Sequence, residues 1–266
     1  MSFTQKKTFA RPPSIKPVNS DGIVVRHCHG LLEFDRCIQV EREVWQSSEI
    51  DVVPSPLFVV ASEIGGQVLG AFDGSKLVGF TMALVGWRNR KPFLHSHMTA
   101  VLEGYRDRKI GQRLKFFQRE DALARGIDLI EWTFDPLVTK NAYFNLMRLG
   151  AVVRRYLPNV YGITTSPLHA SLPTDRLVAE WHLRSPRVLQ ALARKPIQRL
   201  VPKKLVRITI PDTMEELRSS EPARAIHDQT ELREQFLNLF AKGYTATRVV
   251  PGNGGTDYIL ERGRVK

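Results

Sequence analysis

The sequence predicts a mixed α/β fold, because strand-like runs and segments of helical periodicity alternate along most of the chain. Two strand-like runs, residues 68–72 and 77–85, are joined by Asp73-Gly74-Ser75-Lys76, and Asp-Gly between β-rich runs predicts a hairpin. Residues 111–125 place apolar side chains on one stripe and are followed by Gly126, as in an amphipathic helix with a glycine C-cap. We therefore expect strands that are covered by helices.

The same alternation extends to both sides of these elements. Further strands are expected at residues 23–26, 93–101, 129–134, 151–154 and 161–165, and further helices at residues 31–45 and 141–149. Pro54 and Pro56 should break the chain after the first helix. A smaller set follows, with a strand at 205–210, a helix opened by Pro211-Asp212, a helix at 222–242, and strands at 244–250 and 258–260. Its order of elements echoes part of the first half, as a truncated pseudo-repeat would.

The excess of basic residues is concentrated in two parts of the chain. The 266 residues include 39 Lys and Arg against 27 Asp and Glu, a net charge of +12. Two segments without acids hold the whole excess, with four basic residues in 1–20 and eight between Glu180 and Asp212. Three prolines and few apolar residues predict a flexible basic arm over 1–20. After the arm we expect a main domain over 21–180, a basic linker over 181–204 and a small α/β subdomain over 205–266.

Composition excludes several classes of protein. Hydrophobic residues make up 42% and charged residues 25%, which is ordinary for a globular protein and too apolar for a disordered one. Two cysteines form no disulfide framework, and the N-terminus has no apolar signal segment. The longest uncharged run, residues 156–174, contains three prolines and is not expected to span a bilayer. We expect a cytoplasmic protein that does not enter a membrane.

One segment suggests a ligand. From Val101 to Arg113 a strand runs into a basic turn that contains Gly111 and opens a helix. The first amides of a helix have no internal acceptor, and the helix dipole is positive at that end. A pyrophosphate is a natural ligand for such a turn. From the residues alone, an ordinary strand–helix connection with solvated basic side chains stays an equal alternative.

Residues 22–165 resemble the GCN5-related N-acetyltransferase (GNAT) superfamily. The resemblance rests on the strand order, the basic loop before the third helix and the strand–Asn–helix–Leu-Gly pattern at 129–150. The family's coenzyme A signature, Arg/Gln-x-x-Gly-x-Gly/Ala, reads Arg106-Asp-Arg-Lys109-Ile-Gly111 here, so Lys109 replaces the first glycine. His95-Ser-His97-Met and Glu131-Trp-Thr-Phe-Asp-Pro136 resemble an uncharacterised subgroup of larger acetyltransferases. The resemblance implies an α/β (α+β) fold with a mixed, mostly antiparallel central sheet flanked by helices and a smaller α/β C-terminal half.

The resemblance also implies acetyl-CoA, or another acyl-CoA, as co-substrate. By position, the amides of 108–113 would hold the pyrophosphate, and the backbone of 98–101 would pair with the pantetheine arm like an added strand. Asn141 falls where the family has an asparagine that touches pantetheine. The expected cofactor-binding residues are Met98, Thr99, Val101, Arg106, Arg108, Lys109, Ile110, Gly111, Gln112, Arg113 and Asn141. No metal is expected, since His27-Cys28-His29 lacks a matching second pair of ligands.

Acetyl transfer to an amine needs a base and sometimes an acid for the leaving thiolate. His95 and His97 alternate on the strand that should line the acyl site, and His97 is the base candidate; their alternative role is structural. Asp135 is a second candidate, with capping of the turn before Pro136 as its alternative role. The family's acid tyrosine corresponds to Leu146, which leaves Tyr143, nearly one turn earlier, as a poor substitute.

The expected function is that of an acyl-CoA-dependent acyltransferase (N-acetyltransferase-like) that acetylates an amine of a small molecule or peptide. One alternative is a non-catalytic coenzyme A sensor or scaffold, because the tyrosine is missing and the first glycine is replaced. Another is an aminoacyl-tRNA-dependent transferase on a tandem GNAT-like fold, because of the basic stretch and the echo of elements. We favour a solvated linker over a nucleic-acid site for that stretch. No oligomeric state follows from the sequence.

Overall fold

A computed structural model of the protein describes residues 16–46, 48–162, 172–195 and 204–263. The strands in these residues are β1 (Val18–Ser20), β2 (Ile23–His27), β3 (Gln67–Asp73), β4 (Lys76–Arg88), β5 (Lys91–Val101), β6 (Leu129–Phe134), β7 (Val152–Leu157), β8 (Arg176–His182), β9 (Leu205–Pro211), β10 (Tyr244–Gly252) and β11 (Gly255–Arg262). The α-helices are α1 (Gly30–Trp45), α2 (Ser55–Glu63), α3 (Ile110–Ala124), α4 (Thr139–Tyr143), α5 (Pro186–Leu192), α6 (Met214–Ser220) and α7 (Pro222–Ala241). Short 3-10 turns, η1 (Glu49–Asp51) and η2 (Glu103–Tyr105), and the π-helical turn η3 (Phe144–Arg148) complete the described elements.

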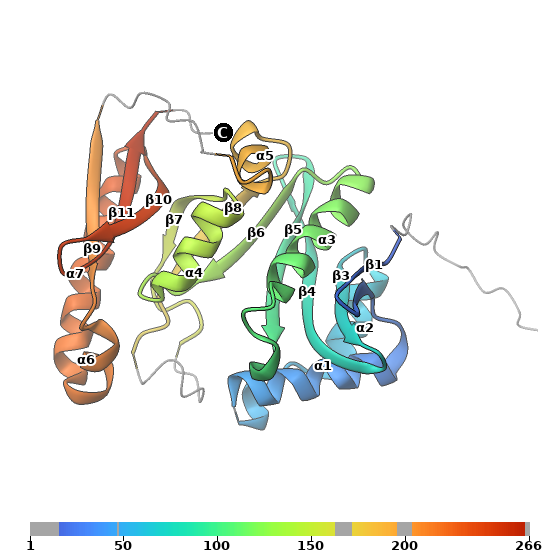
Figure 1. Ribbon diagram of the computed structural model, residues 1–266. Coiled ribbons are helices and arrows are strands. Elements are labelled where there is room, and N and C mark those ends of the chain that lie inside the picture. Colours follow the sequence, from blue (N-terminus) through green and yellow to red (C-terminus); the bar gives the residue numbers. More distant parts are fainter. Residues whose placement is uncertain (1–15, 47, 163–171, 196–203, 264–266) are drawn as a thin grey trace, which may run out of the picture.

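The strands form one sheet in the order β1-β2-β3-β4-β5-β6-β8-β7-β10-β11-β9 (Figure 1). Among these neighbours, β5 and β6 are parallel and the other pairs run antiparallel. The expected fold class, a mostly antiparallel central sheet flanked by helices with a smaller α/β C-terminal half, is therefore confirmed. The candidate site described below lies at β5 and β6, the one parallel pair in this order.

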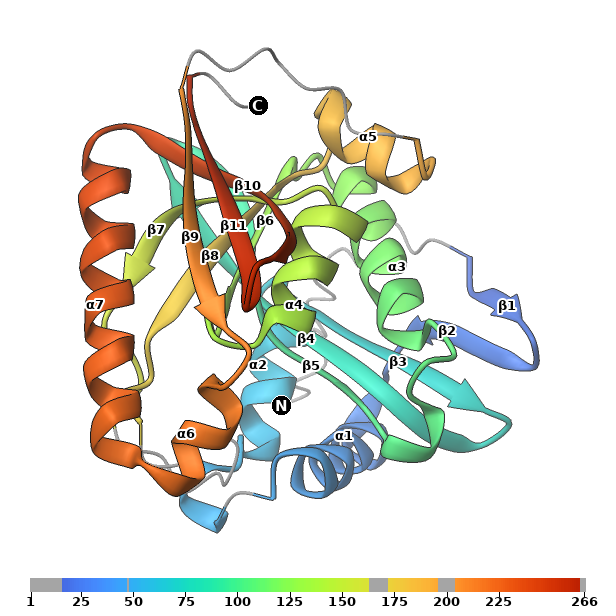
Figure 2. The same cartoon turned by 60° about the vertical axis from the view of Figure 1, so that its left-hand side comes forward.

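Helices cover both faces of the sheet. On the face that we call the front face, Phe34 of α1 and Phe58 of α2 share a buried cluster with Met98 of β5. On the opposite, back face, α3 packs through Leu114 and its neighbours onto β2, β3 and β4. Helices α3 and α4 lie side by side across the middle of the sheet (Figures 1 and 2). Burial of these apolar stripes provides the main stabilisation of the layers.

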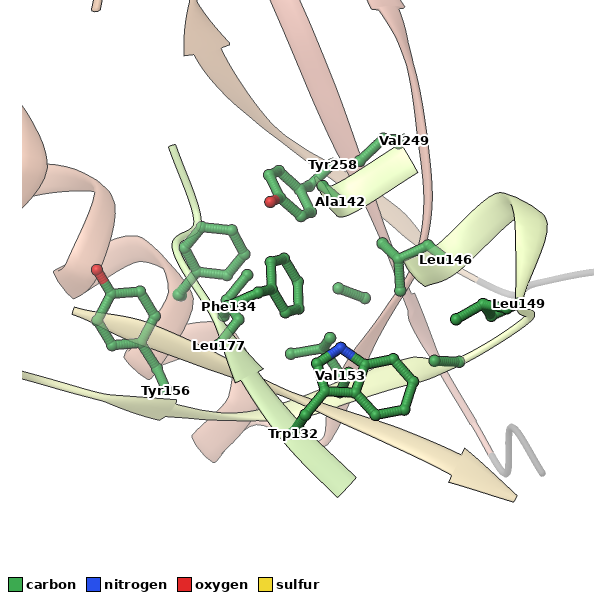
Figure 3. Packing of buried hydrophobic residues seen from close by; sticks show 14 of the residues in the cluster. Trp132, Phe134, Ala142, Leu146, Leu149, Val153, Tyr156, Leu177, Val249 and Tyr258 are labelled. Atoms are coloured by element: carbon green, nitrogen blue, oxygen red, sulfur yellow. The ribbon is translucent and has the colours of Figure 1, made fainter. Parts of the chain in front are cut away.

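The largest core cluster lies on the back face and continues into the C-terminal half. Trp132 of β6 lies close to Leu146 of η3, and Tyr258 of β11 packs above α4 (Figure 3). The ring of Tyr156 on β7 stacks on Phe236 of α7, with 5.7 Å between ring centroids. The two halves of the chain thus share one hydrophobic core.

The C-terminal half repeats an order of elements but not its pairing. Strand β9, helices α6 and α7, and the hairpin β10–β11 match the order of β2, α1, α2 and the hairpin β3–β4. However, β2 pairs with β3, the first strand of its hairpin, whereas β9 pairs with β11, the second strand. The echo seen in the sequence is therefore confirmed for the element order alone, and the strand arrangement differs from that of a repeat.

Two sequence expectations differ from the structure. The prolines at 54 and 56 do not end regular structure, because Pro56 lies in the first turn of α2, where a missing amide hydrogen costs nothing. The expected strand at 161–165 is not found where it can be checked, since Tyr161 lies in a turn and residues 163–165 are outside the described residues. β7 instead pairs with β8, a strand that the sequence did not predict, and through one residue pair with β10.

The predicted basic segments are described only in part. Residues 1–15 of the arm and 196–203 of the linker lie outside the described residues, and Val18–Ser20 pairs with β2. Within the linker, α5 buries Arg187, whose guanidinium donates to backbone carbonyls of Gly150, Leu146 and Thr247. The boundaries of the arm, the linker and the C-terminal subdomain stay a prediction.

Candidate functional site

Strands β5 and β6 are neighbours only at their beginnings. Their parallel pairing consists of Leu94 with Ile130 and His95 with Glu131, and beyond these residues the strands separate. Residues 96–101 of β5 pair with β4 on one side and, among the described residues, with no strand on the other. We call this region the parting. Unpaired backbone groups at such an edge can bind an extended ligand as an added strand.

A β-bulge in β5 lies at the start of the parting. Ser96 is opposite Ala83 and Met98 is opposite Met82, so His97 is the extra residue. The bulge changes which side chains face which layer. Ser96 contacts α3 on the back face, whereas Met98 belongs to the front-face core. His97 and His95 have ring centroids 6.2 Å apart, and His97 is exposed.

The N-terminus of α3 is open. Lys109 precedes the helix in the left-handed conformation, with φ 59° and ψ 18°, and its side chain caps no amide. No described residue accepts a hydrogen bond from the backbone amides of residues 107–112. Lys109 thus keeps a conformation that favours glycine, at a cost of about 1 kcal/mol. The amides and the helix dipole together present positive charge to any ligand at this turn.

The side chains around this turn differ in what they can offer an anion. Arg106 and Arg108 are exposed, and the Arg108 guanidinium lies 5.2 Å from the centre of the Tyr105 ring. Arg113 instead donates to the carbonyl oxygen of Ile23, and burial lowers its pKa. At Gly111 an added Cβ would meet only Val101, at 4.0 Å, so the approach to the amides is open. Arg106 and Arg108 can therefore contact an anion at the N-terminus of α3, whereas Arg113 is held by its hydrogen bond to β2.

Of the remaining predicted cofactor residues, Thr99 and Val101 lie along the parting, whereas Ile110 is buried in the back-face core beside Leu114. Thr99 and Val101 follow the bulge on β5, and the Thr99 hydroxyl lies 2.8 Å from that of Thr81. Asn141 is exposed on α4, on the C-terminal side of β6. The fold therefore brings the predicted strand and the predicted turn together along the open edge of β5.

A buried polar cluster closes the parting on the back face. Lys115 of α3 is 4% exposed, and its Nζ donates to Ser96 Oγ at 2.7 Å and to Gln118 Oε1 at 3.1 Å. The same atom lies 4.3 Å from the centre of the Trp132 ring. Burial lowers the pKa of Lys115 to about 7. The sequence did not predict Lys115 as a site residue. Its position on the apolar stripe of the helix is the pattern that could have indicated a buried lysine.

On the front face, buried carboxylates lie under arginines. Glu131 is 3% exposed and accepts hydrogen bonds from Arg88 and, at 2.6 Å, from Arg155 Nη2. Glu180, on the neighbouring strand, accepts from Arg154 at 2.5 Å. The carboxylates are neutralised and covered, whereas the guanidinium groups of Arg88 and Arg155 are about 40% exposed. The surface presented beside His95 and His97 is therefore basic.

The three predicted catalytic residues lie in different environments. Partial desolvation of the ring lowers the pKa of His97, which is otherwise exposed, and this leaves a neutral imidazole that can accept a proton at pH 7. Both oxygens of Asp135 are bound, one to the amide of Leu137 at 2.8 Å and the other to Arg218 at 2.8 Å. Tyr143 is exposed beside Arg148, at 5.4 Å from the guanidinium to the ring centre. Of the three, only His97 lies at the bulge, and the contacts of Asp135 fit its alternative role at the turn.

The described residues contain neither a metal-binding cluster nor a helix that could span a membrane. Among the described residues, no three His, Cys, Asp or Glu side chains are placed to hold a metal ion together. His27 instead pairs with Asp121 at 3.0 Å. None of the described helices is long and apolar enough to cross a bilayer.

No protein-family model and no curated protein matches the chain. Solved structures similar to it include the ribosomal-protein-S18-alanine N-acetyltransferase from Escherichia coli, with 12% identity, a TM-score of 0.49, and coverage of 61% of this chain and 95% of that chain. NAA60 from Arabidopsis thaliana, solved with a bisubstrate analogue, has 16% identity, a TM-score of 0.48 and coverage of 60% and 97%. A GNAT family acetyltransferase from Elizabethkingia anophelis, solved with acetyl-CoA bound, has 13% identity, a TM-score of 0.44 and coverage of 61% and 99%. At such identities and TM-scores the likeness is one of fold and carries no argument about the reaction.

Proposed function

We propose that this chain is an acyl-CoA-dependent acyltransferase that transfers an acetyl group to an amine. One juxtaposition carries the proposal. The turn before α3 and the first residues of the helix hold six amides, of residues 107–112, without an acceptor among the described residues, and they lie at the end of a strand whose outer edge pairs with no described strand beyond the bulge. A pyrophosphate attached to a long amide-containing arm matches both parts at once. The amides bind the anion, and residues 96–101 pair with the arm.

The residues present fit the coenzyme. The amides of residues 107–112 have no acceptor among the described residues and are free to donate to phosphate oxygens, and Gly111 leaves room for those oxygens to approach. Arg106, Arg108 and Lys109 add charge around the turn. Asn141 would contact the arm from α4. Bound there, acyl-CoA supplies an activated acyl group whose thioester is open to attack by an amine.

Catalysis would rest on orientation and on removal of a proton. The acceptor would approach from the front face, where His97 is exposed at the bulge. A neutral imidazole there takes the proton from the attacking amine, and holding amine and thioester together lowers the barrier further. Asp135 and Tyr143 remain weaker catalytic candidates. Asp135 is already bound on both oxygens, and Tyr143 lies on the exposed side of α4.

The alternatives differ in what they predict. A non-catalytic sensor is motivated by Leu146, which is fully buried where the resemblance implies an acid tyrosine. It predicts binding of acetyl-CoA without release of thiol in the presence of any amine. The aminoacyl-tRNA-dependent transferase loses part of its motivation, because the C-terminal half does not repeat the strand pairing of the first half.

Isothermal titration with acetyl-CoA tests the proposal. We expect binding by the wild type and, since an added Cβ at residue 111 meets nothing closer than 4.0 Å, binding within about threefold for Gly111→Ala. Gly111→Trp should weaken binding by at least about 50-fold, because the indole would occupy the place of the phosphates. Thiol release with a panel of amines then separates the enzyme from the sensor. If wild-type protein gives no measurable binding, the proposal is wrong.

A further inference from the structure

Lys115 lies at the point where β5 and β6 separate. The last paired residues are His95 and Glu131, so Ser96 and Trp132 are the first residues of the two strands beyond the pairing. Lys115 contacts both, through a 2.7 Å hydrogen bond to Ser96 Oγ and a 4.3 Å distance from Nζ to the centre of the Trp132 ring. Its amine therefore spans the closed end of the parting from the back face.

The partners of this amine are all neutral. Besides Ser96 and Trp132, Gln118 accepts at 3.1 Å, and no described carboxylate lies within ion-pair distance of Nζ. Among the titratable groups around it is His95: burial and the neighbouring His97 lower the pKa of His95 most, and the charge on Lys115 lowers it further. Glu131 faces the front side of the sheet and is already bound by Arg88 and Arg155.

A buried ammonium without a counter-ion weakens the fold. Removing such a charge from water is costly, and three neutral partners repay only part of the cost. A methionine of similar length would fill the same space without that cost. Charged groups kept in such places cluster at functional sites, because a low-dielectric surrounding strengthens their effect on a bound ligand.

The position of Lys115 matches one part of the proposed ligand. From Val101 to Ser96 the strand rises by about 17 Å. An arm anchored at the N-terminus of α3 and paired along β5 therefore carries its sulfur end towards Ser96. When an amine displaces the thioester, the carbon–sulfur bond breaks and its electron pair stays on the sulfur, so negative charge develops at that end.

We propose that Lys115 supplies the positive charge that stabilises the coenzyme thiolate, with the Ser96 hydroxyl as the donor between them. Ser96 Oγ accepts a hydrogen from Lys115. Its own hydrogen faces a long 3.4 Å contact with Thr81 Oγ1, and rotation of the hydroxyl would let it donate to the sulfur instead. The inference rests on the proposed function, since it needs coenzyme A in the parting.

The ionisation of bound coenzyme A tests this role without any acceptor. The thiolate absorbs ultraviolet light that the thiol does not, and free coenzyme A, titrated in the same way, gives the reference pH of ionisation. Burial lowers the pKa of Lys115 to about 7, and an ammonium and a thiolate side by side each favour the charged form of the other. We therefore expect the thiol of coenzyme A bound to the wild type to ionise at least about one pH unit lower. In Lys115→Met, which keeps the length of the side chain, the thiol should ionise at or above its free value. Lys115→Arg, which keeps the charge, should retain most of the shift. Lys242→Met, an exposed lysine on α7's C-terminal side, is the matched control and should behave as the wild type.

The outcomes separate the inference from the function beneath it. If the wild type does not bind coenzyme A, the proposed function fails and this inference fails with it. If wild type and Lys115→Met both bind it and the bound thiol ionises at the same pH in both, Lys115 has no electrostatic role and only this inference is overturned. With an acceptor in hand, Lys115→Met should lower kcat about 10- to 100-fold while changing the affinity for coenzyme A less than about threefold.

Discussion

The two halves of this chain share an order of elements and differ in what they leave unpaired. In the first half, the strand–helix–helix–hairpin unit is followed by β5 and β6, which separate after two residue pairs. In the second half, the hairpin β10–β11 and the strand β9 are joined by ladders that run along their whole lengths. However, β10 pairs with its other neighbour, β7, through Ala246 and Val153 alone, so interrupted pairing is not confined to the first half. The proposed ligand site therefore depends also on the turn before α3.

The two regions also differ in whether their backbone polar groups have partners within the chain. At the N-terminus of α3, the amides of residues 107–112 have no acceptor among the described residues. Near the C-terminal half, the carbonyls of Leu146, Gly150 and Thr247 all accept from the buried guanidinium of Arg187. In the first region these polar groups have no partner among the described residues, as the proposed ligand site requires, and in the second they are satisfied within the chain.

The largest predicted loss of stability is for a substitution of Arg187. Burial lowers its pKa to about 10, so it stays charged at neutral pH and holds three carbonyls that belong to η3, the following turn and β10. Arg187→Met should lower the free energy of unfolding by about 3 kcal/mol, because those carbonyls lose their donor while buried. Urea denaturation measures this change. Arg184→Met is the matched control in the same basic segment, since its exposed pair with Asp128 should contribute less than about 1 kcal/mol. Equal stabilities for the two variants would contradict the role given to Arg187.

A smaller effect is expected where the two halves meet. Asp135 follows β6, and Arg218 lies on α6, and their side chains pair at 2.8 Å while largely buried. Asp135→Asn keeps an oxygen for the amide of Leu137 but weakens the pair, so we expect a loss of about 1–2 kcal/mol in unfolding free energy. The rate of acetyl transfer should change less than about threefold. A large fall in rate with unchanged stability would instead make Asp135 the catalytic base.

Local patterns in the sequence predicted most of the elements correctly. The Asp-Gly hairpin, the helix that became α3 and the strand at 129–134 all depend on neighbouring residues, which a single sequence contains. The same holds for the turn that precedes α3. Helix α2 was missed because Pro56 was read as a break, although proline is well tolerated in the first turn of a helix.

The unpredicted features depend on contacts between distant residues. The ion pair of Asp135 joins residues 83 positions apart, and no local pattern indicates it. Lys115 lies on an apolar helix stripe, but only the packing of α3 against Ser96 and Trp132 shows that its amine is buried. The strand order of the C-terminal half likewise follows from pairings that the element order leaves open.

Hydrogen–deuterium exchange with and without coenzyme A tests whether the turn before α3 and the open edge of β5 bind the coenzyme. The amides of residues 107–112 and of residues 96–101 should exchange more slowly when coenzyme A is added. No change is expected in the paired strands β10 and β11, which serve as the internal reference. Protection confined to the C-terminal strands, or no protection at either part of the proposed site under saturating coenzyme A, would contradict this prediction.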